Sequence, residues 1–462
     1  MRHLVTLALL GAFTAAFAPG CIPTDFDDRR NEASTRTVSP PDGYSFSRFG
    51  TVVTGYSGTV AGQFGSRVAA SAGADTPFSV FPMLIGNDLR LDTPTIDGCD
   101  METPCDRGAA ASLVGMPTFG GRSLCIATAA METGAGKVNC EDDATRFETF
   151  VAPSGVRFGF AGTGLRTPHA FGAALYGAPG AVGGAGAVYR LSGSAATELD
   201  LSMGAGVGRQ LGTSVAIGIQ DADTVLIASG APSGATKRVI MATVDIDAGG
   251  AATTSVRGCV DATGRGFGEA VAVGDFNGDG LQDVAIGSGA GDGSEPRENF
   301  IRIFDGAAMP APGSCVDAWG EAYRLSCPDS EGVVCDESSN FGASLAVGDV
   351  NGDGIDDLVV GAPNADVDGS GSAGAVYVFA GAATLVNLDV DVAVLTHSSP
   401  STNANLGFAV ATVPGQMGTA GRRDEVVAGA PGVSRVYVFL CTGIQGDSRS
   451  EFGGTQCQPL DT

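Results

Sequence analysis

Histidine is scarce in this chain, with three among 462 residues, and His3 falls within an apolar N-terminal segment. We expect the other two, His169 in RTPHAFG and His397 in VLTHSSP, to be turn residues beside strands. The sequence also has no G-x-S-x-G, no H-E-x-x-H and no phosphate-cradling glycine loop. These absences disfavour enzymes that need a histidine base, a histidine-held zinc ion or a bound nucleotide.

Positive charge is also in short supply. The chain has 26 Lys and Arg against 51 Asp and Glu, a formal net charge of -25. Such a surface repels nucleic-acid phosphates and favours bound cations, so we expect no DNA or RNA partner. The composition, 44% hydrophobic and 17% charged, favours a globular protein over disorder. Glycine, at 71 residues, is about twice as frequent as usual, which favours many tight turns between short strands.

The N-terminal sequence MRHLVTLALLGAFTAAFAPG places a basic start before an apolar stretch that is short for a membrane span, so we expect residues 1–20 to be a signal peptide. Ala16-Phe17-Ala18 offers one cleavage site, but Pro19 follows it. Gly20-Cys21 resembles a bacterial lipobox, with Pro19 where a small residue is usual. The resemblance implies export, a lipid on Cys21 as the sole membrane attachment, and a place at the bacterial outer membrane or cell surface. Residues 21–45 are polar and predict a flexible tether.

The cysteine count agrees with an oxidising compartment. Of eleven cysteines, removing Cys21 leaves ten, an even number suited to disulfides. Pairing neighbours in sequence gives Cys99 with Cys105, Cys125 with Cys140, Cys327 with Cys335, Cys441 with Cys457 and, by elimination, Cys259 with Cys315. Sequence proximity does not fix this connectivity. The alternative, a zinc site, is disfavoured because no C-x-x-C pair occurs.

One module recurs along the chain. Each copy opens with Phe-Gly or Leu-Gly and an alternating strand, crosses a turn, continues in an apolar strand that ends near Gly-Ala-Pro, and adds a third strand. The six openings are Phe64-Gly65, Phe158-Gly159, Leu211-Gly212, Phe267-Gly268, Phe341-Gly342 and Leu406-Gly407. The second strands end at 113–117, 175–179, 228–232, 285–289, 359–363 and 427–431. The openings lie about fifty to ninety residues apart, which suits blades of a β-propeller with loop insertions.

Two copies are specific enough to indicate a family. FGEAVAVGDFNGDGLQDVAIGSG, from residue 267, and FGASLAVGDVNGDGIDDLVVGAP, from residue 341, resemble the FG-GAP repeats of integrin alpha-subunit propellers. The resemblance implies a seven-bladed ring closed by strands from both chain ends. Six full modules occur, with fragments at Phe49-Gly50 and Phe452-Gly453. We therefore predict an all-β fold, a β-propeller of six or seven four-stranded blades over residues 46–462.

The same two copies carry acid-rich turns, DFNGDGLQD and DVNGDGIDD. Oxygens fall at positions one, three, five and nine, with a backbone carbonyl at seven, and a hard cation such as calcium takes six to eight oxygens. The candidate ligands are Asp275, Asn277, Asp279, the Leu281 carbonyl and Asp283, then Asp349, Asn351, Asp353, the Ile355 carbonyl and Asp357. The turns resemble the calcium-binding hairpin of integrin blades. The alternative is an acidic hairpin closed by Asx hydrogen bonds, in which three carboxylates repel one another.

These observations lead to three hypotheses for function. The first is an exported, lipid-anchored, calcium-binding propeller that acts as a binding or adhesion module for an extracellular or periplasmic protein or glycan, since loops on a rigid scaffold concentrate recognition. Adhesion rests on fold analogy alone. The second is a propeller enzyme that acts on polysaccharide through a carboxylate pair, although no pair stands out. The third is a passive scaffold of the cell envelope.

Overall fold

A computed structural model describes residues 158–440, with gaps, and only the strands before residue 157. The gaps are 166–168, 173, 193–194, 202–209, 235, 263–265, 289–298, 314–318, 329, 331, 389–391, 397–400, 414–423 and 434. Residues 1–33 and 441–462 lie outside the described residues, and with them the predicted signal peptide and Cys21. Within the described ranges, no helix is long and apolar enough to cross a membrane.

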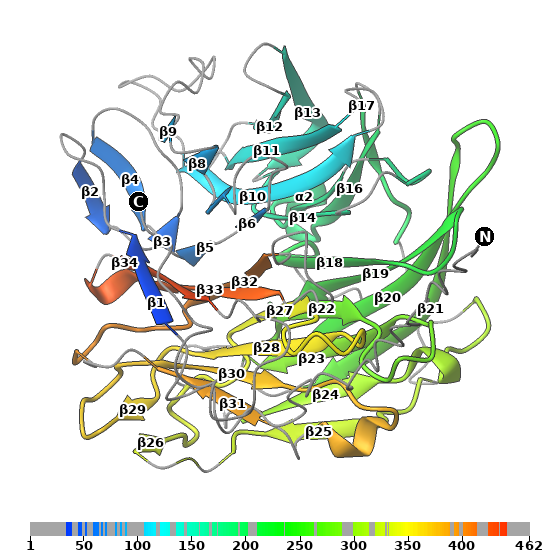
Figure 1. Cartoon of the computed structure of the whole chain (residues 1–462). Coiled ribbons are helices and arrows are strands. Elements are labelled where there is room, and N and C mark those ends of the chain that lie inside the picture. The colour runs from blue at the N-terminus through cyan, green and yellow to red at the C-terminus, as the bar shows by residue number, and fades with distance from the viewer. Residues whose placement is uncertain are drawn as a thin grey trace, which may run out of the picture.

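Six four-stranded antiparallel sheets, here called blades 1 to 6, make up most of the fold (Figure 1). Blade 1 contains β10 (Asp106–Met116), β11 (Gly121–Ala129), β12 (Ala135–Asp142) and β13 (Arg146–Val156). Blade 2 contains β14 (Ala161–Gly164), β15 (Ala174–Ala178), β16 (Ala187–Ser192) and β17 (Ala195–Glu198). Blade 3 contains β18 (Ser214–Ile219), β19 (Thr224–Ala231), β20 (Lys237–Ile246) and β21 (Ala252–Ala262).

Blade 4 contains β22 (Phe267–Gly274), β23 (Asp283–Ser288), β24 (Phe300–Phe304) and β25 (Tyr323–Ser326). Blade 5 contains β27 (Ser344–Gly348), β28 (Asp357–Ala362), β30 (Ala375–Phe379) and β31 (Val392–Leu395). Blade 6 contains β32 (Ala409–Val413), β33 (Glu425–Ala430), β34 (Arg435–Leu440) and β1 (Ser34–Val38). Among the described residues, the helical segments are single turns: α2 (Ala181–Gly184), η2 (Gly306–Ala308), η3 (Leu385–Asn387) and η4 (Pro431–Val433).

Short two-stranded pairs complete the described fold. They are β2 (Ser45–Arg48) with β4 (Thr59–Gln63), β3 (Thr51–Val52) with β5 (Ser66–Arg67), β6 (Ala70–Ser71) with β7 (Ser79–Val80), β8 (Leu84–Ile85) with β9 (Asp88–Leu89), and β26 (Val333–Val334) with β29 (Asp366–Val367).

The first strands of the blades form the inside of a ring. Along the chain, β10 contacts β14, and the contacts continue through β18, β22 and β27 to β32. Between β32 and β10, the ring position is taken by the short strands β3 to β6, because β5 and β6 contact β32 while β3, β4 and β5 contact β10. The predicted all-β propeller is therefore confirmed, with six complete blades and short pairs at the remaining position.

The ring is closed by strands from the two chain ends, as the resemblance implied. β1 pairs antiparallel with β34, with Ser34 opposite Leu440 and Val38 opposite Val436, and forms the outer strand of blade 6. Residues 34–38, within the segment predicted as a tether, form this strand. The sequence STRTV is rich in β-branched residues, and β34 would otherwise leave its edge unpaired.

The first module differs from the others in how its strands are used. Residues 113–116, predicted to end a second strand, belong to β10, the first strand of blade 1. An apolar strand pattern indicates a strand but not its place in a sheet. The predicted opening at residues 64 and 65 falls between β4 and β5, in the region of short pairs.

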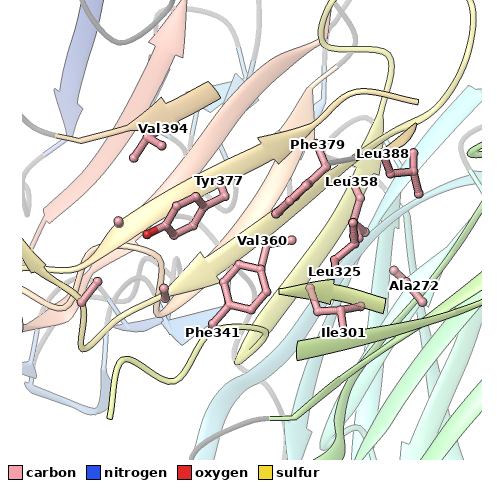
Figure 2. Packing of buried hydrophobic residues seen from close by; sticks show 14 of the residues in the cluster. Ala272, Ile301, Leu325, Phe341, Leu358, Val360, Tyr377, Phe379, Leu388 and Val394 are labelled. Atoms are coloured by element: carbon pink, nitrogen blue, oxygen red, sulfur yellow. The ribbon is translucent and has the colours of Figure 1, made fainter. Parts of the chain in front are cut away.

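Blades pack face to face through apolar layers. Between blades 4 and 5, Ile301 and Leu325 of the earlier blade join Phe341, Leu358 and Val360 in one buried cluster (Figure 2). In the same cluster the Phe341 ring packs edge-on against Tyr377 at 5.5 Å and against Phe379 at 5.9 Å between ring centroids. The Phe of the Phe-Gly opening therefore anchors its own blade to the core.

The glycines of the repeated motif let neighbouring backbones touch. A Cβ added at Gly361 in β28 would overlap the carbonyl oxygen of Gly407 in the next blade's opening. The same relation joins Gly177 to Gly212, Gly230 to Gly268 and Gly287 to Gly342. Gly407 also has φ +84°, which L residues with side chains rarely adopt, and its carbonyl accepts a 2.8 Å hydrogen bond from Ser344 Oγ. The motif thus spaces adjacent blades by backbone contact.

Replacing one of these glycines should loosen a blade junction. We expect Gly361→Ala to lower the free energy of unfolding by about 2 kcal/mol, because the methyl group has no room against Gly407. Gly320→Ala is the matched control, since a Cβ there meets nothing within 4 Å. Denaturant unfolding measures both, and equal stability of the two variants would contradict the junction role.

Candidate metal-binding turns

Both acid-rich turns join the first and second strands of their blades, β22 to β23 and β27 to β28. Because strands alternate in direction within each antiparallel sheet and first strands neighbour one another around the ring, all first turns lie at one end of the propeller. We call this the turn end. The Phe-Gly openings and Gly-Ala-Pro segments lie at the opposite end, here called the loop end.

In blade 4 the side-chain oxygens fold back onto the turn's own amides. Asp275 Oδ1 and Asn277 Oδ1 both accept from the Asp279 amide, at 3.1 and 2.9 Å, and Asp275 Oδ2 accepts from the Gly280 amide at 2.9 Å. Asp279 Oδ1 accepts from the Leu281 amide at 2.8 Å. The positive φ of Gly280, +86°, allows the tight path.

The turn in blade 5 repeats this arrangement. Asp349 Oδ1 and Asn351 Oδ1 both accept from the Asp353 amide, at 3.0 and 2.9 Å, and Asp353 Oδ1 accepts from the Ile355 amide at 2.8 Å. In addition, Asn351 Nδ2 donates to Asp353 Oδ2 at 2.9 Å. Oxygens at positions one and three therefore converge on a single amide in both turns.

The acid at the ninth position of each turn is buried and makes contacts outside the turn. Asp283 is fully buried, and its carboxylate accepts from the amides of Phe276 at 3.0 Å and Gly306 at 2.7 Å. Asp357 is fully buried too, and accepts from the amides of Val350 at 2.7 Å and Gly381 at 2.9 Å. Each therefore ties its turn to the end of the third strand of its blade.

Burial dominates the ionisation of these two acids. It raises the pKa of Asp283 to about 7 and that of Asp357 to about 8, although the amide hydrogen bonds act in the opposite direction. Nearby acids, Asp305 and Asp279 beside Asp283 and Asp353 beside Asp357, raise both values further. Burial likewise raises the pKa of Asp349.

The donor set suits a hard cation, although the side chains are not yet gathered around one point. Among the described residues, no three His, Cys, Asp or Glu side chains lie close enough together to hold a metal ion. Each carboxylate oxygen has a second lone pair besides the one that faces an amide. The Leu281 and Ile355 carbonyls belong to the same turns, on half-buried residues. The all-oxygen set of carboxylate, amide and carbonyl groups is the chemistry that calcium prefers.

The histidines and cysteines can be placed in part. The Gly172 amide donates to the His169 carbonyl at 3.0 Å, so the turn prediction for His169 is confirmed. The His169 side chain accepts at Nδ1 from the Phe171 amide at 3.0 Å and donates from Nε2 to the Asp221 carbonyl at 2.7 Å. His397 lies outside the described residues. Cys327 and Cys335 form the predicted disulfide, with their Cα atoms 6.0 Å apart.

The other predicted disulfides are described only in part. Cys125 and Cys140 stand opposite each other in the register of β11 and β12. Cys259 is disulfide-bonded. Its predicted partner Cys315 lies outside the described residues, as do Cys99, Cys105, Cys441 and Cys457.

Sequence reasoning missed the residues that link one first turn to the next. Asp356 Oδ2 accepts from the Asp275 amide at 3.0 Å, and the Asp356 amide donates to the Asp275 carbonyl at 3.1 Å. The Asp424 amide likewise donates to the Asp349 carbonyl at 2.6 Å. Their position in the sequence could have identified them, because each of these acids directly precedes the second strand of its blade.

Comparisons with known proteins place these turns within recognised repeats. The family model of the FG-GAP repeat matches residues 267–300 and 341–379, the two segments that contain the acid-rich turns. No curated protein matches the chain. Among solved structures, the crystal structure of an ancestral GH74 enzyme is similar at 11% identity and a TM-score of 0.38, over 75% of this chain and 43% of that one.

The raised pKa values predict how stability changes with pH when metal is absent. The unfolded aspartate titrates near pH 3.9, so between that pH and about 8 the folded Asp357 binds a proton that the unfolded chain lacks. Metal-free protein should therefore lose stability as pH rises from 5 to 8. Thermal unfolding in metal-free buffer tests this: Asp357→Asn should flatten the pH dependence, whereas exposed Asp368→Asn should not. A wild-type melting temperature that rises over this range would contradict the assignment.

Proposed function

Because the chain is a β-propeller that carries FG-GAP repeats in blades 4 and 5, we propose that it is a calcium-stabilised binding module of the bacterial cell envelope. Calcium holds the turn end of the propeller, and an extracellular or periplasmic protein or glycan binds at the loop end. The lipid on Cys21 attaches the module to the membrane.

The observation that carries the calcium proposal is the repetition of one donor set in two adjacent blades. Asp275 and Asn277 in blade 4, and Asp349 and Asn351 in blade 5, converge in the same way on the amide of the fifth position. The three acids of each turn repel one another when they ionise without a counter-ion, and a cation turns that repulsion into attraction.

The proposal for the loop end rests on loops and exposed apolar residues. The segment that joins β28 to β30 contains β29, which pairs with β26 from the connection between blades 4 and 5. Val334 in β26 is 59% exposed and Phe408, beside the opening of blade 6, is 41% exposed. Side chains of this kind on a rigid ring are suited to a binding surface.

Calcium should raise the stability of the folded protein. At free calcium a hundred times the dissociation constant, one site adds about 2.7 kcal/mol. Chelation should therefore lower the melting temperature, and Asp279→Ala or Asp353→Ala should each remove part of the calcium effect, with the double variant removing nearly all of it. Asp368→Asn, an exposed acid at the loop end, is the control for loss of one charge. Identical melting of wild type with calcium and with chelator would overturn the proposal.

Partner binding can be tested with soluble protein that keeps the closing strand. A Cys21→Ser chain beginning at residue 21 preserves β1, which a deletion through residue 45 would remove. On a glycan array and in pull-down from envelope extract, we expect one class of partner that binds with calcium and is lost with Phe408→Ser. Turnover of a polysaccharide, abolished by one carboxylate substitution, would instead favour the enzyme. Absence of both binding and turnover would favour the scaffold.

A further inference from the structure

Neighbouring blades are joined at the turn end by a contact that recurs from one junction to the next. The residue before the second strand of one blade lies against the glycine that ends, or nearly ends, the first strand of the preceding blade. A Cβ at Gly274 would lie 3.1 Å from Asp356 Oδ2, and one at Gly348 would overlap Asp424 Oδ2. We call Asp356 and Asp424 the junction acids.

The junction acids hold the first residue of the preceding turn. Asp356 contacts both backbone groups of Asp275. The Asp356 carboxylate accepts from the Asp275 amide, and the Asp356 amide donates to the Asp275 carbonyl. The Asp424 amide donates to the Asp349 carbonyl, and its side chain is 8% exposed. Asp275 and Asp349 are the first candidate ligands of the two acid-rich turns, so each junction acid fixes the start of a turn in the neighbouring blade.

A third junction shows what changes where the preceding turn lacks the ligand pattern. Blade 3 has Gln220 and Asp221 in a shorter turn, and there Gln282 takes the junction position. A Cβ at Gly218 would overlap Gln282 Oε1, and the Gln282 amide donates to Gln220 Oε1 at 3.3 Å. The contact with glycine persists with a neutral side chain. Among these three junctions, the acid occurs only beside the two acid-rich turns.

From this correspondence we propose that Asp356 and Asp424 are positioning residues that set the cation affinity of the turn in the preceding blade: Asp356 for residues 275–283 and Asp424 for residues 349–357. Each acid hydrogen-bonds to the backbone of the first candidate ligand and places a further carboxyl group beside a turn that already contains three acids. A cation in the turn would offset the repulsion that a further acid adds at this place. The inference rests on the proposed function, because it requires that the turns bind calcium.

Asp424 gives the cleaner test, because its own turn lacks the ligand pattern whereas Asp356 belongs to one. Calorimetric titration of calcium into Asp279→Ala protein isolates the turn at 349–357, and titration into Asp353→Ala protein isolates the turn at 275–283. Adding Asp424→Ala should weaken the first affinity about tenfold, as is typical for residues that support ligands, and leave the second unchanged. Asp424→Asn, which keeps an acceptor oxygen, should give a smaller loss, and Asp368→Asn should give none.

Asp424 is buried, so we expect its replacement to lower stability as well, and folding needs its own control. All titrations are made at a temperature at which circular dichroism shows each variant to be folded. Unchanged affinity at residues 349–357 in folded Asp424→Ala protein would overturn the positioning role while leaving calcium binding intact. An equal loss at both turns would also overturn it, since that result indicates general destabilisation. Absence of calcium binding by wild type would overturn the proposed function as well.

Discussion

The structure depends on one contact, the approach of backbone to backbone where neighbouring blades meet. At Gly361 and Gly407, and at the equivalent pairs, there is no space for a single methyl group between the two backbone segments. Apolar layers such as that of Phe341, Tyr377 and Phe379 can fill the volume between blades only once this spacing is set. The Phe-Gly opening of one blade and the Gly-Ala-Pro segment of the previous blade therefore form a single contact, in which the two glycines face each other.

The two ends of the ring are built on different principles. At the loop end, glycine contacts fix the blades, so segments such as the one containing β29 extend outward without disturbing the joint. At the turn end, blades are linked through hydrogen bonds between first turns, from His169 with Asp221 to Asp356 with Asp275. Those bonds involve polar groups whose geometry is sensitive to charge. Any ion held there would therefore act on two neighbouring blades rather than on one hairpin.

Much of this architecture could be predicted from the sequence because it depends on residues that are close together in the chain. The openings, the apolar strands and the glycine-rich turns each depend on residues within one module, and the all-β propeller followed from their repetition. β1 could not be found in this way, because the five residues of STRTV become a strand only against the edge of β34, about 400 residues away. The first strand of blade 1 was misplaced for a related reason, since apolar residues 113–116 fit any strand of a sheet.

The candidate site shows the same division. The convergence of positions one and three on the amide of position five is local, because it depends only on the spacing of residues within one turn. The role of Asp283 and Asp357 could not be predicted, because it depends on Gly306 and Gly381, which follow the third strand of each blade. The contacts between neighbouring turns could not be predicted from the sequence either. Asp424 follows two arginines in a module without the ligand pattern, and only the fold brings it to Asp349. In a propeller, the surroundings of a turn therefore depend partly on the next blade, and a module examined by itself omits the residue that contacts the first position of its turn.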